Sequence, residues 1–367
     1  MLRLTLSERS PKGNEPMASV SIKDIAARAG VSFQTVSKVL KGKGSVSPET
    51  RAWILEVAEQ LGYVPNAVAR SLVSQRTGTI GIVATDFSDY VLAQLMVGAE
   101  HEARRQGQCA IVGSVDAEGA DSERYVRLLM ERRVDGILLA APQLEQNERI
   151  GEMLRGQLPV VSIHHIAGGG IVTVGSHQSQ VGLIATQHLL ELGHRRIGTI
   201  VGPRDRRVSQ SRLRGYQRAL NAADIAFKPE LVEEGDWQVE GGYEAARRLL
   251  LRAPDLTAIF AQNDMMALGS LSALHDQRRR VPEHCAVVGC DDIPFAAHAI
   301  PSLTTVHLPF YETGEAAMRL LLDIINGQAT EPEQRLSLPV YLVQRASSSK
   351  HIPQPNTGTT PNGKEII

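Results

Sequence analysis

The spacing of apolar residues along the chain changes near residue 79. Up to that point apolar residues recur every three or four positions, and the segments 22–29, 33–42, 48–61 and 67–74 are predicted as amphipathic helices. Gly30 ends the first helix and Ser32 begins the second, so only a short turn separates them. Two short helices joined in this way are typical of a helix-turn-helix.

Beyond residue 79, short β-rich apolar runs alternate with amphipathic helices. The predicted strands lie within 79–85, 108–114, 135–141, 159–163, 195–202, 257–261 and 285–290. Fully apolar strands between helices indicate a parallel sheet that is covered on both faces. One open sheet usually holds fewer such units, so we expect two similar lobes with a cleft between them. Ligands of such sheets bind at the carboxyl ends of the strands.

The charge of the chain is unevenly distributed. The 367 residues carry a net charge of −1, with 43% hydrophobic and 22% charged residues, as in ordinary globular proteins. Residues 19–76, however, contain eight basic and four acidic residues, a net charge of +4, and the part that follows carries −6. A basic head on an acidic body indicates a nucleic-acid module that is joined to a second function.

Several classes of protein are disfavoured. The chain contains neither the run of about 18–20 apolar residues that spans a membrane nor a secretory signal, so we expect a cytoplasmic protein without membrane contact. Cys109, Cys285 and Cys290 form no CxxC pair and lie in apolar runs, which predicts buried reduced thiols. We expect no metal, no cofactor and no enzymatic activity, because no ligand cluster, phosphate loop or nucleophile–base motif is found.

The second helix of the head carries side chains that suit the major groove of DNA. Phe33 can contact a thymine methyl group, Gln34 can pair with adenine and Lys38 can reach guanine. The side chains predicted to contact phosphate are Ser21, Ser37, Lys41, Ser45 and Ser47. A small structural three-helix bundle with a solvated face is the alternative, and the charge of +4 favours DNA.

The head closely resembles that of LacI/GalR-type transcriptional regulators. The similar segments are SIKDIAARAGVSFQTVSKVLKG and VSPETRAWILEVAEQLGYVPNAVARSL, and the body adds GTIGIV, LGHRRIGTIVGP, AIFAQNDMMALG and VVGCDDIPFAAHAIPSLTTV. The resemblance covers about residues 19–345. It implies an all-α helix-turn-helix headpiece on an α/β body with two lobes. That body is similar to a periplasmic sugar-binding protein, with two parallel-sheet, Rossmann-like subdomains.

The resemblance also implies a division of the chain. Residues 1–18 form a disordered extension, 19–64 the headpiece, 65–78 the hinge helix and linker, 79–345 the effector-binding and dimerisation domain, and 346–367 a disordered tail. The N-lobe comprises about 79–176 and 308–336, and the C-lobe about 177–307 and 337–345.

Functional residues can be carried over from the family one by one. Phe33, Gln34 and Lys38 match positions that read bases. Leu72 matches a hinge leucine that wedges into the minor groove, with Asn66 and Ala69 beside it. The residues that match effector contacts are Asp86, Phe87, His164, Arg212, Trp237, Asn263, Asp291 and Phe310.

Structural roles remain open for several of these side chains. Asn263, Asp264, Asp291 and Asp292 could be helix caps. Trp237 and His164 could belong to the core, and Leu72 to an ordinary linker helix.

These features predict a ligand-responsive repressor of sugar-catabolic genes. Such a protein binds a pseudo-palindromic double-stranded operator as a homodimer and is released by a sugar-like effector. The tail lacks a leucine heptad, so we expect a dimer and not a tetramer. One alternative is a regulator that a purine or another metabolite activates as co-repressor. A solute-binding protein is a second alternative, against which the head and the missing signal peptide argue.

Overall fold

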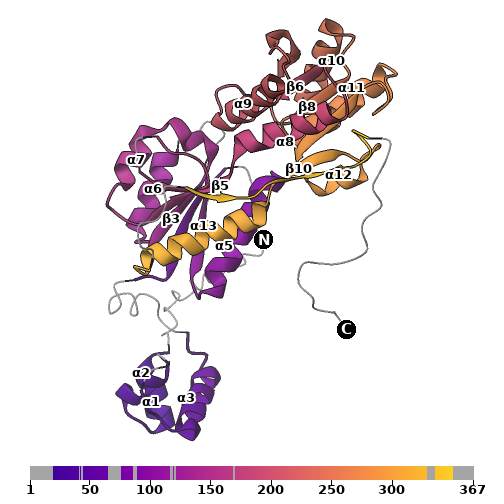
Figure 1. Ribbon diagram of the computed structural model, residues 1–367. Helices are drawn as coiled ribbons and strands as arrows, with labels where there is room; N and C mark the ends of the chain where they lie inside the picture. The colour runs from indigo at the N-terminus through magenta and orange to yellow at the C-terminus, as the bar shows by residue number, and fades with distance from the viewer. Residues whose placement is uncertain are drawn as a thin grey trace, which may run out of the picture. The chain divides into compact units, whose positions relative to one another are not determined.

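The computed structural model describes residues 20–40, 42, 44–64, 76–85, 89–115, 119, 121–167, 170–328 and 335–349. They belong to two compact units, one that ends at Gln75 and one that begins at Arg76. Figure 1 shows the first unit as a group of helices and the second as two lobes in which helices surround sheets.

The head unit contains α1 (Ile22–Ala29), α2 (Phe33–Leu40) and α3 (Pro48–Gln60). Ser21 and Asp24 form a capping box at the start of α1, and Gly30 ends this helix in the left-handed conformation with φ 68°. Ser47 caps α3, whose first residue is proline. The predicted helix-turn-helix is therefore confirmed. Its core consists of Ile25, Ala26, Val36, Val39, Ile54, Val57 and Ala58.

The first lobe is built on six parallel strands in the order β11-β5-β4-β3-β1-β2. They are β1 (Thr79–Ala84), β2 (Cys109–Ser114), β3 (Gly136–Ala140), β4 (Val160–Ser162), β5 (Val172–Ser176) and β11 (Arg335–Leu338). Two separate apolar clusters cover the two faces of this sheet. One cluster includes α5 (Tyr90–Arg105) and α13 (Phe310–Ile325), and the other α6 (Ser122–Glu131), η1 (Pro142–Gln146) and α7 (Glu148–Leu154).

The second lobe has six strands in the order β12-β10-β9-β8-β6-β7. They are β6 (Ile197–Val201), β7 (Val232–Glu234), β8 (Ala258–Ala261), β9 (Ala286–Asp291), β10 (Thr304–His307) and β12 (Tyr341–Val343). Helices α8 (Gln178–Glu191) and α9 (Arg207–Ala222) pack in one cluster, and α10 (Val239–Arg252) and α11 (Asp264–Asp276) in the other. The short elements are η2 (Pro229–Leu231) and α12 (Pro294–His298). Strand β12 is antiparallel to β10, which is the one departure from the predicted parallel sheets among the described strands.

The chain passes between the lobes after β5, after β10 and between β11 and β12. Helix α13 therefore packs on the first sheet although it follows the last strand of the β6–β10 series. Figure 1 shows this helix, in orange-yellow, lying beside α5.

The start of the predicted disordered tail is instead part of the folded body, and the prediction for residues 346–349 is wrong. Ser347 and Ser348 are buried. The carbonyl of Ser347 accepts a hydrogen bond from the amide of Val287 at 2.8 Å, and its own amide donates to the carbonyl of Ser302. The hydroxyl of Ser348 lies 2.8 Å from Nε2 of His188. These backbone bonds hold the segment to the second lobe.

Cys109 is exposed, which contradicts the expectation of a buried thiol. It begins β2, the strand at the edge of the first sheet. Ile111 and Val112 of the same strand are also more than two-fifths exposed. An edge strand has a neighbour on one side only, so an apolar run in it need not be buried. Cys285 and Cys290 are buried as expected.

Three pairs of helices touch backbone to backbone at glycines. A methyl group placed at Gly182 of α8 would lie 1.9 Å from the carbonyl oxygen of Arg212 in α9. The reciprocal position, Gly215 of α9, would meet the carbonyl of Ser179 at 2.0 Å. The other reciprocal pairs are Gly98 with Gly314, between α5 and α13, and Gly242 with Gly269, between α10 and α11. These helices can pack so closely only because no side chain stands between them.

We predict that Gly182→Ala lowers the free energy of unfolding by about 3 kcal/mol, because α8 and α9 must move apart. Helix propensity alone favours alanine by about 1 kcal/mol, so it predicts the opposite sign. Urea denaturation followed by circular dichroism measures the difference. The control is Gln187→Ala on the exposed side of α8, which should leave the midpoint unchanged. A Gly182→Ala protein as stable as the parent would show that this close contact is dispensable.

Candidate DNA interface and effector site

The exposed face of α2 carries the three side chains that the sequence assigns to base reading. Phe33, Gln34 and Lys38 are exposed, whereas Val36 and Val39 on the same helix are buried in the head core. Half of the surface of Phe33 is accessible to solvent. An aromatic ring, an amide and an ammonium group on one face of a short helix suit the base edges of the major groove.

Two of the predicted phosphate contacts also serve as helix caps. The hydroxyl of Ser21 donates to the carboxylate of Asp24 at 2.7 Å, and that of Ser47 accepts from the amide of Thr50 at 3.2 Å. Ser45 is exposed and Ser37 is half-buried on α2. Lys41, the hinge residues Asn66, Ala69 and Leu72, and the predicted effector contacts Asp86 and Phe87 lie outside the described residues, and their roles stay predictions.

Arg212 lies in the first half of α9 and is almost fully buried in the second lobe, with 5% of its surface exposed. Its Nε donates to Oε1 of Gln178 at 2.8 Å, and Nη1 donates to the carbonyl oxygen of Gln262. The guanidinium carbon lies 5.8 Å from the centre of the Trp237 ring. The sequence did not single out Gln178 or Gln262. Gln262 directly follows the predicted strand 257–261, whereas the strand before Gln178, β5, was not predicted.

Asp291 ends β9 and faces Arg212, with 3.7 Å between Oδ1 and Nη2. Burial raises the pKa of Asp291 to about 7, and the charge of Arg212 opposes this shift. The backbone of Asp291 has φ 116°, a conformation that non-glycine residues adopt at a cost of about 1–3 kcal/mol. Asp291 does not cap a helix, because the next helix, α12, begins at Pro294 and has no side-chain cap.

Asn263 is the cap of α11 and also holds the backbone beside Trp237. Its Oδ1 accepts from the amide of Met266, and its Nδ2 donates to the carbonyl of Trp237, each at 2.9 Å. The Trp237 ring lies against Gly202, where a methyl group would approach Cζ2 within 2.1 Å. The capping role left open for Asn263 is thus real, and it positions the aromatic ring.

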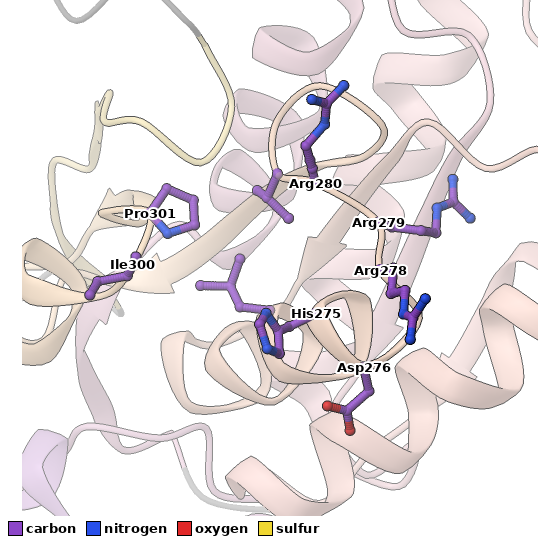
Figure 2. Close-up of a pocket in the computed structure, with 9 residues that line it drawn as sticks. His275, Asp276, Arg278, Arg279, Arg280, Ile300 and Pro301 are labelled. Atoms are coloured by element: carbon purple, nitrogen blue, oxygen red, sulfur yellow. The ribbon is translucent and has the colours of Figure 1, made fainter.

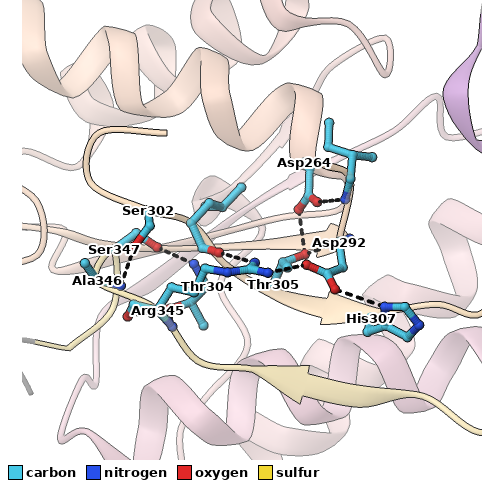
Figure 3. Close-up of polar contacts among 11 residues, drawn as sticks. Asp264, Asp292, Ser302, Thr304, Thr305, His307, Arg345, Ala346 and Ser347 are labelled. Atoms are coloured by element: carbon cyan, nitrogen blue, oxygen red, sulfur yellow. Dashed lines mark hydrogen bonds and ion pairs between the residues drawn. The ribbon is translucent and has the colours of Figure 1, made fainter. Parts of the chain in front are cut away.

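The two other acids of this region have structural partners (Figure 3). Asp264 is fully buried and accepts from the amide of Ile293 at 2.9 Å and the hydroxyl of Thr305 at 2.6 Å. Burial and the nearby Asp291 carboxyl raise its pKa well above the usual range. Asp292 pairs with Arg345 at 2.6 Å and His307 at 3.0 Å. The cap predicted for Asp292 is wrong, since the helix that follows it, α12, has no side-chain cap.

His164 follows β4 in the first lobe and lies beside Glu145, with 3.8 Å between Nδ1 and Oε1. Burial, with a smaller effect of Arg206, lowers the pKa of His164 to about 4, so its imidazole is neutral at pH 7. Burial raises the pKa of Glu145. The sequence did not identify Glu145, which sits in an ordinary polar stretch.

Glu145 also lies where the two lobes touch. Its Oε2 accepts from the amide of Arg207 at the start of α9, at 3.3 Å. Two further bonds of 3.3 Å join the same segments, from Arg206 to the carbonyl of Pro142 and from Gln146 to the carbonyl of Asp205. The helix that carries Arg212 is thus held to the opposite lobe at its first turn.

Phe310 begins α13 at the junction of the two lobes. Its side chain packs against the apolar cluster of α8 and α9 and also against the cluster formed by Ala84, Leu92, Leu95 and Ala140 of the first lobe. Arg212, Trp237, Asn263 and Asp291 form one group in the second lobe, whereas His164 belongs to the first and Phe310 touches both.

A hollow of about 640 Å³ beside the C-terminal end of α11 contains none of these residues. Figure 2 shows that the side chains of Arg278, Arg279 and Arg280, which line it, point in different directions. Arg279 donates to the carbonyl oxygens of Pro254 and Leu256. These arginines therefore do not converge on one anion.

The described part of the chain offers neither a metal site nor a membrane span. Within it, no three His, Cys, Asp or Glu side chains are grouped so that they could hold a metal ion. None of the helices in these same ranges combines the length and apolar character needed to cross a membrane.

Comparison with known proteins identifies both parts of the chain. Residues 21–66 match the bacterial regulatory proteins of the lacI family, and residues 186–348 match the periplasmic binding protein-like domain. The HTH-type transcriptional regulator CelR of Thermobifida fusca is 38% identical over 336 residues, covering 88% of this chain and 96% of that protein. The HTH-type transcriptional repressor PurR of Haemophilus influenzae is 32% identical over 329 residues, covering 89% and 98%.

Solved structures extend the similarity to three dimensions. A complex of the regulator CelR with cellobiose is 37% identical, with a TM-score of 0.69, and covers 90% of this chain and 100% of that one. The lac repressor dimer bound to operator and the anti-inducer ONPF is 29% identical, with a TM-score of 0.82 and coverage of 90% and 99%. The relatives of this chain are transcriptional regulators and not enzymes. The chain belongs to the LacI family of bacterial regulatory proteins.

Proposed function

We propose that this regulator represses genes of carbohydrate catabolism in the cytoplasm and is released from its operator by a neutral sugar. The observation that carries the proposal is the buried pair of Arg212 and Asp291, with the half-buried Trp237 beside it, at the carboxyl end of the second sheet. A guanidinium, a carboxyl and an aromatic ring are the groups that bind sugar hydroxyls and sugar faces.

The charges around this group favour an uncharged ligand. Asp291 has its pKa raised to about 7, so near neutral pH it offsets part of the charge of Arg212, and the carbonyl of Gln262 accepts one hydrogen bond from the guanidinium. His164 carries no charge at neutral pH, because burial lowers its pKa. A phosphorylated sugar would need unpaired cations, which this group does not offer. A disaccharide such as cellobiose, the ligand in the CelR complex, is our leading candidate.

The likeness to PurR supports a second candidate ligand, a purine that acts as co-repressor. Purine rings can stack on Trp237, and their edges can pair with Asp291. The two ligands predict opposite changes in operator affinity, since a sugar inducer weakens operator binding and a co-repressor strengthens it.

DNA binding uses two copies of the head. We assign base reading to Phe33, Gln34 and Lys38 and minor-groove contact to the hinge at Asn66, Ala69 and Leu72. A pseudo-palindromic operator follows from the two-fold symmetry of a dimer. Effector binding changes how the lobes sit, and the coupling to DNA is expected to be about 1–3 kcal/mol, as is typical of allosteric proteins.

We predict that cellobiose raises the melting midpoint of the parent protein and that Arg212→Ala abolishes this rise while operator binding persists. A ligand that binds only the native state shifts unfolding by mass action. Differential scanning fluorimetry with cellobiose, ribose, adenine and guanine measures the shift. DNA for the binding assay is a duplex that the parent protein selects from a randomised pool.

Arg212→Lys is a second variant, which keeps the charge and loses the planar fork, and it should retain a weak response. The control is Arg149→Ala, because the Arg149 side chain is 81% exposed and its ion pair with Glu123 is long, at 3.8 Å. A normal response in Arg212→Ala would rule out this effector site.

We predict that Leu72→Ala weakens binding to the selected duplex by about ten- to a hundredfold, because a wedge between base steps is lost. Binding to a scrambled duplex depends mainly on phosphate contacts and should stay within about twofold. Fluorescence anisotropy at one fixed salt concentration measures both affinities. Equal losses for the two duplexes would argue that Leu72 supports the fold of the hinge and does not contact DNA.

We predict that the protein is a dimer at micromolar concentration in the absence of DNA. The similar lac repressor structure is a dimer bound to operator, and a two-fold dimer matches a pseudo-palindromic site. Size-exclusion chromatography with light scattering should therefore give twice the chain mass of 39.9 kDa. A mass of four chains would contradict this assignment.

A further inference from the structure

The chain enters the body at Arg76, where the last residue of α13 and its C-cap, Asn326, bind the Arg76 side chain. Nη1 of Arg76 donates to Oδ1 of Asn326 at 2.6 Å, and Nη2 donates to the carbonyl oxygen of Ile325. The last carbonyls of a helix lack partners within it and carry the negative end of the helix dipole. A guanidinium that donates twice to this end forms charge-assisted bonds.

The next two residues are held by one carboxylate. Asp135, directly before β3, accepts from the amide of Thr77 and the amide of Gly78, each at 2.8 Å. The hydroxyl of Thr77 donates to the same carboxylate at 3.1 Å and to the carbonyl of Arg133 at 2.9 Å. The first residues of the body are thus fixed at two separate points of the first lobe.

Helix α13 connects this entry point with the junction of the lobes. Its 16 residues begin at Phe310 and end at Ile325, a length of about 24 Å. Its inner face is buried in the sheet cluster, and Gly314 brings its backbone against the carbonyl of Leu95 in α5. Two ion pairs also join α13 to α5, namely Arg319 with Glu102 and Glu315 with Arg105. A helix held on so many sides moves as a rigid body together with α5.

We propose that Arg76 is the positioning residue through which α13 couples the effector site to the hinge. A shift of Phe310 at the lobe junction moves the C-terminal end of α13, and Arg76 carries this movement to the chain segment that leads to the head. The inference rests on the proposed function, because it takes Phe310 as a neighbour of the effector.

The test compares Arg76→Ala with the parent protein in the full chain. Fluorescence anisotropy gives the affinity for the selected duplex with and without cellobiose, and the ratio of the two is the coupling factor. Calorimetry gives the affinity for cellobiose without DNA. We expect a parent coupling factor between about 5 and 150, as for typical allosteric pairs, and a factor within about twofold of unity in Arg76→Ala. The cellobiose affinity itself should stay within about twofold, since Arg76 does not touch the effector site.

Four further variants separate coupling from general stability. Arg76→Lys keeps the charge near the helix end and loses the two-point contact, so it should restore part of the coupling. Asn326→Ala should reduce the coupling, and adding it to Arg76→Ala should cause no further loss, as expected for two partners of one interaction. Arg149→Ala should behave as the parent.

Two results would overturn the proposal. One is a full coupling factor in Arg76→Ala, and the other is loss of cellobiose binding in that variant. If operator binding by the parent does not respond to cellobiose, the proposed effector is wrong. The role of Arg76 is then tested by the preference for the selected duplex, measured as the ratio of the affinities for the selected and the scrambled duplex. This preference should fall in Arg76→Ala and not in Arg149→Ala, because an unanchored hinge loses more conformational freedom on specific binding. An unchanged preference would then overturn the role of Arg76.

Discussion

Close backbone contact between paired helices is the constraint on which the arrangement of the proposed effector site depends. Each of the three reciprocal glycine pairs involves a helix that carries a site residue, namely α9 with Arg212, α11 capped by Asn263, and α13 with Phe310. At Gly182 the contact is made by the carbonyl of Arg212 itself. The position of the guanidinium is therefore set by the backbone of a neighbouring helix, which is stiffer than a contact between side chains.

Buried charge is the second feature that shapes the site. Asp264, Asp291 and Asp292 follow two adjacent strands, yet each has a different environment. Hydrogen bonds from Ile293 and Thr305 occupy Asp264, and the pair with Arg345 and His307 occupies Asp292. Of the three, Asp291 alone pairs with Arg212, whose guanidinium lies beside the Trp237 ring, and its backbone is strained at φ 116°. The ligand assignment therefore rests on Asp291, because it is the one of these three acids that pairs with Arg212.

The contacts between the lobes show how an effector could act on the DNA end of the body. Glu145 of the first lobe caps the start of α9, and Phe310 packs on both lobes where α13 begins. Arg212 therefore lies on a helix that contacts both lobes. Phe310 lies at the start of α13, and the C-terminal end of this helix binds Arg76. A ligand bound beside Arg212 would change both contacts, because each depends on the distance between the lobes.

The sequence alone determined those features that arise within a few residues of one another. The head helices, their caps at Ser21 and Ser47, the left-handed stop at Gly30 and the alternation of strands with helices all follow from short periods and local hydrogen bonds. Tertiary structure alone decided the exposure of Cys109, the burial of Ser347, the role of Glu145 and the anchoring of Arg76. Arg76 and Asn326 are 250 positions apart. No local pattern encodes such a pair, because the strand order and the crossings between the lobes determine which distant residues meet.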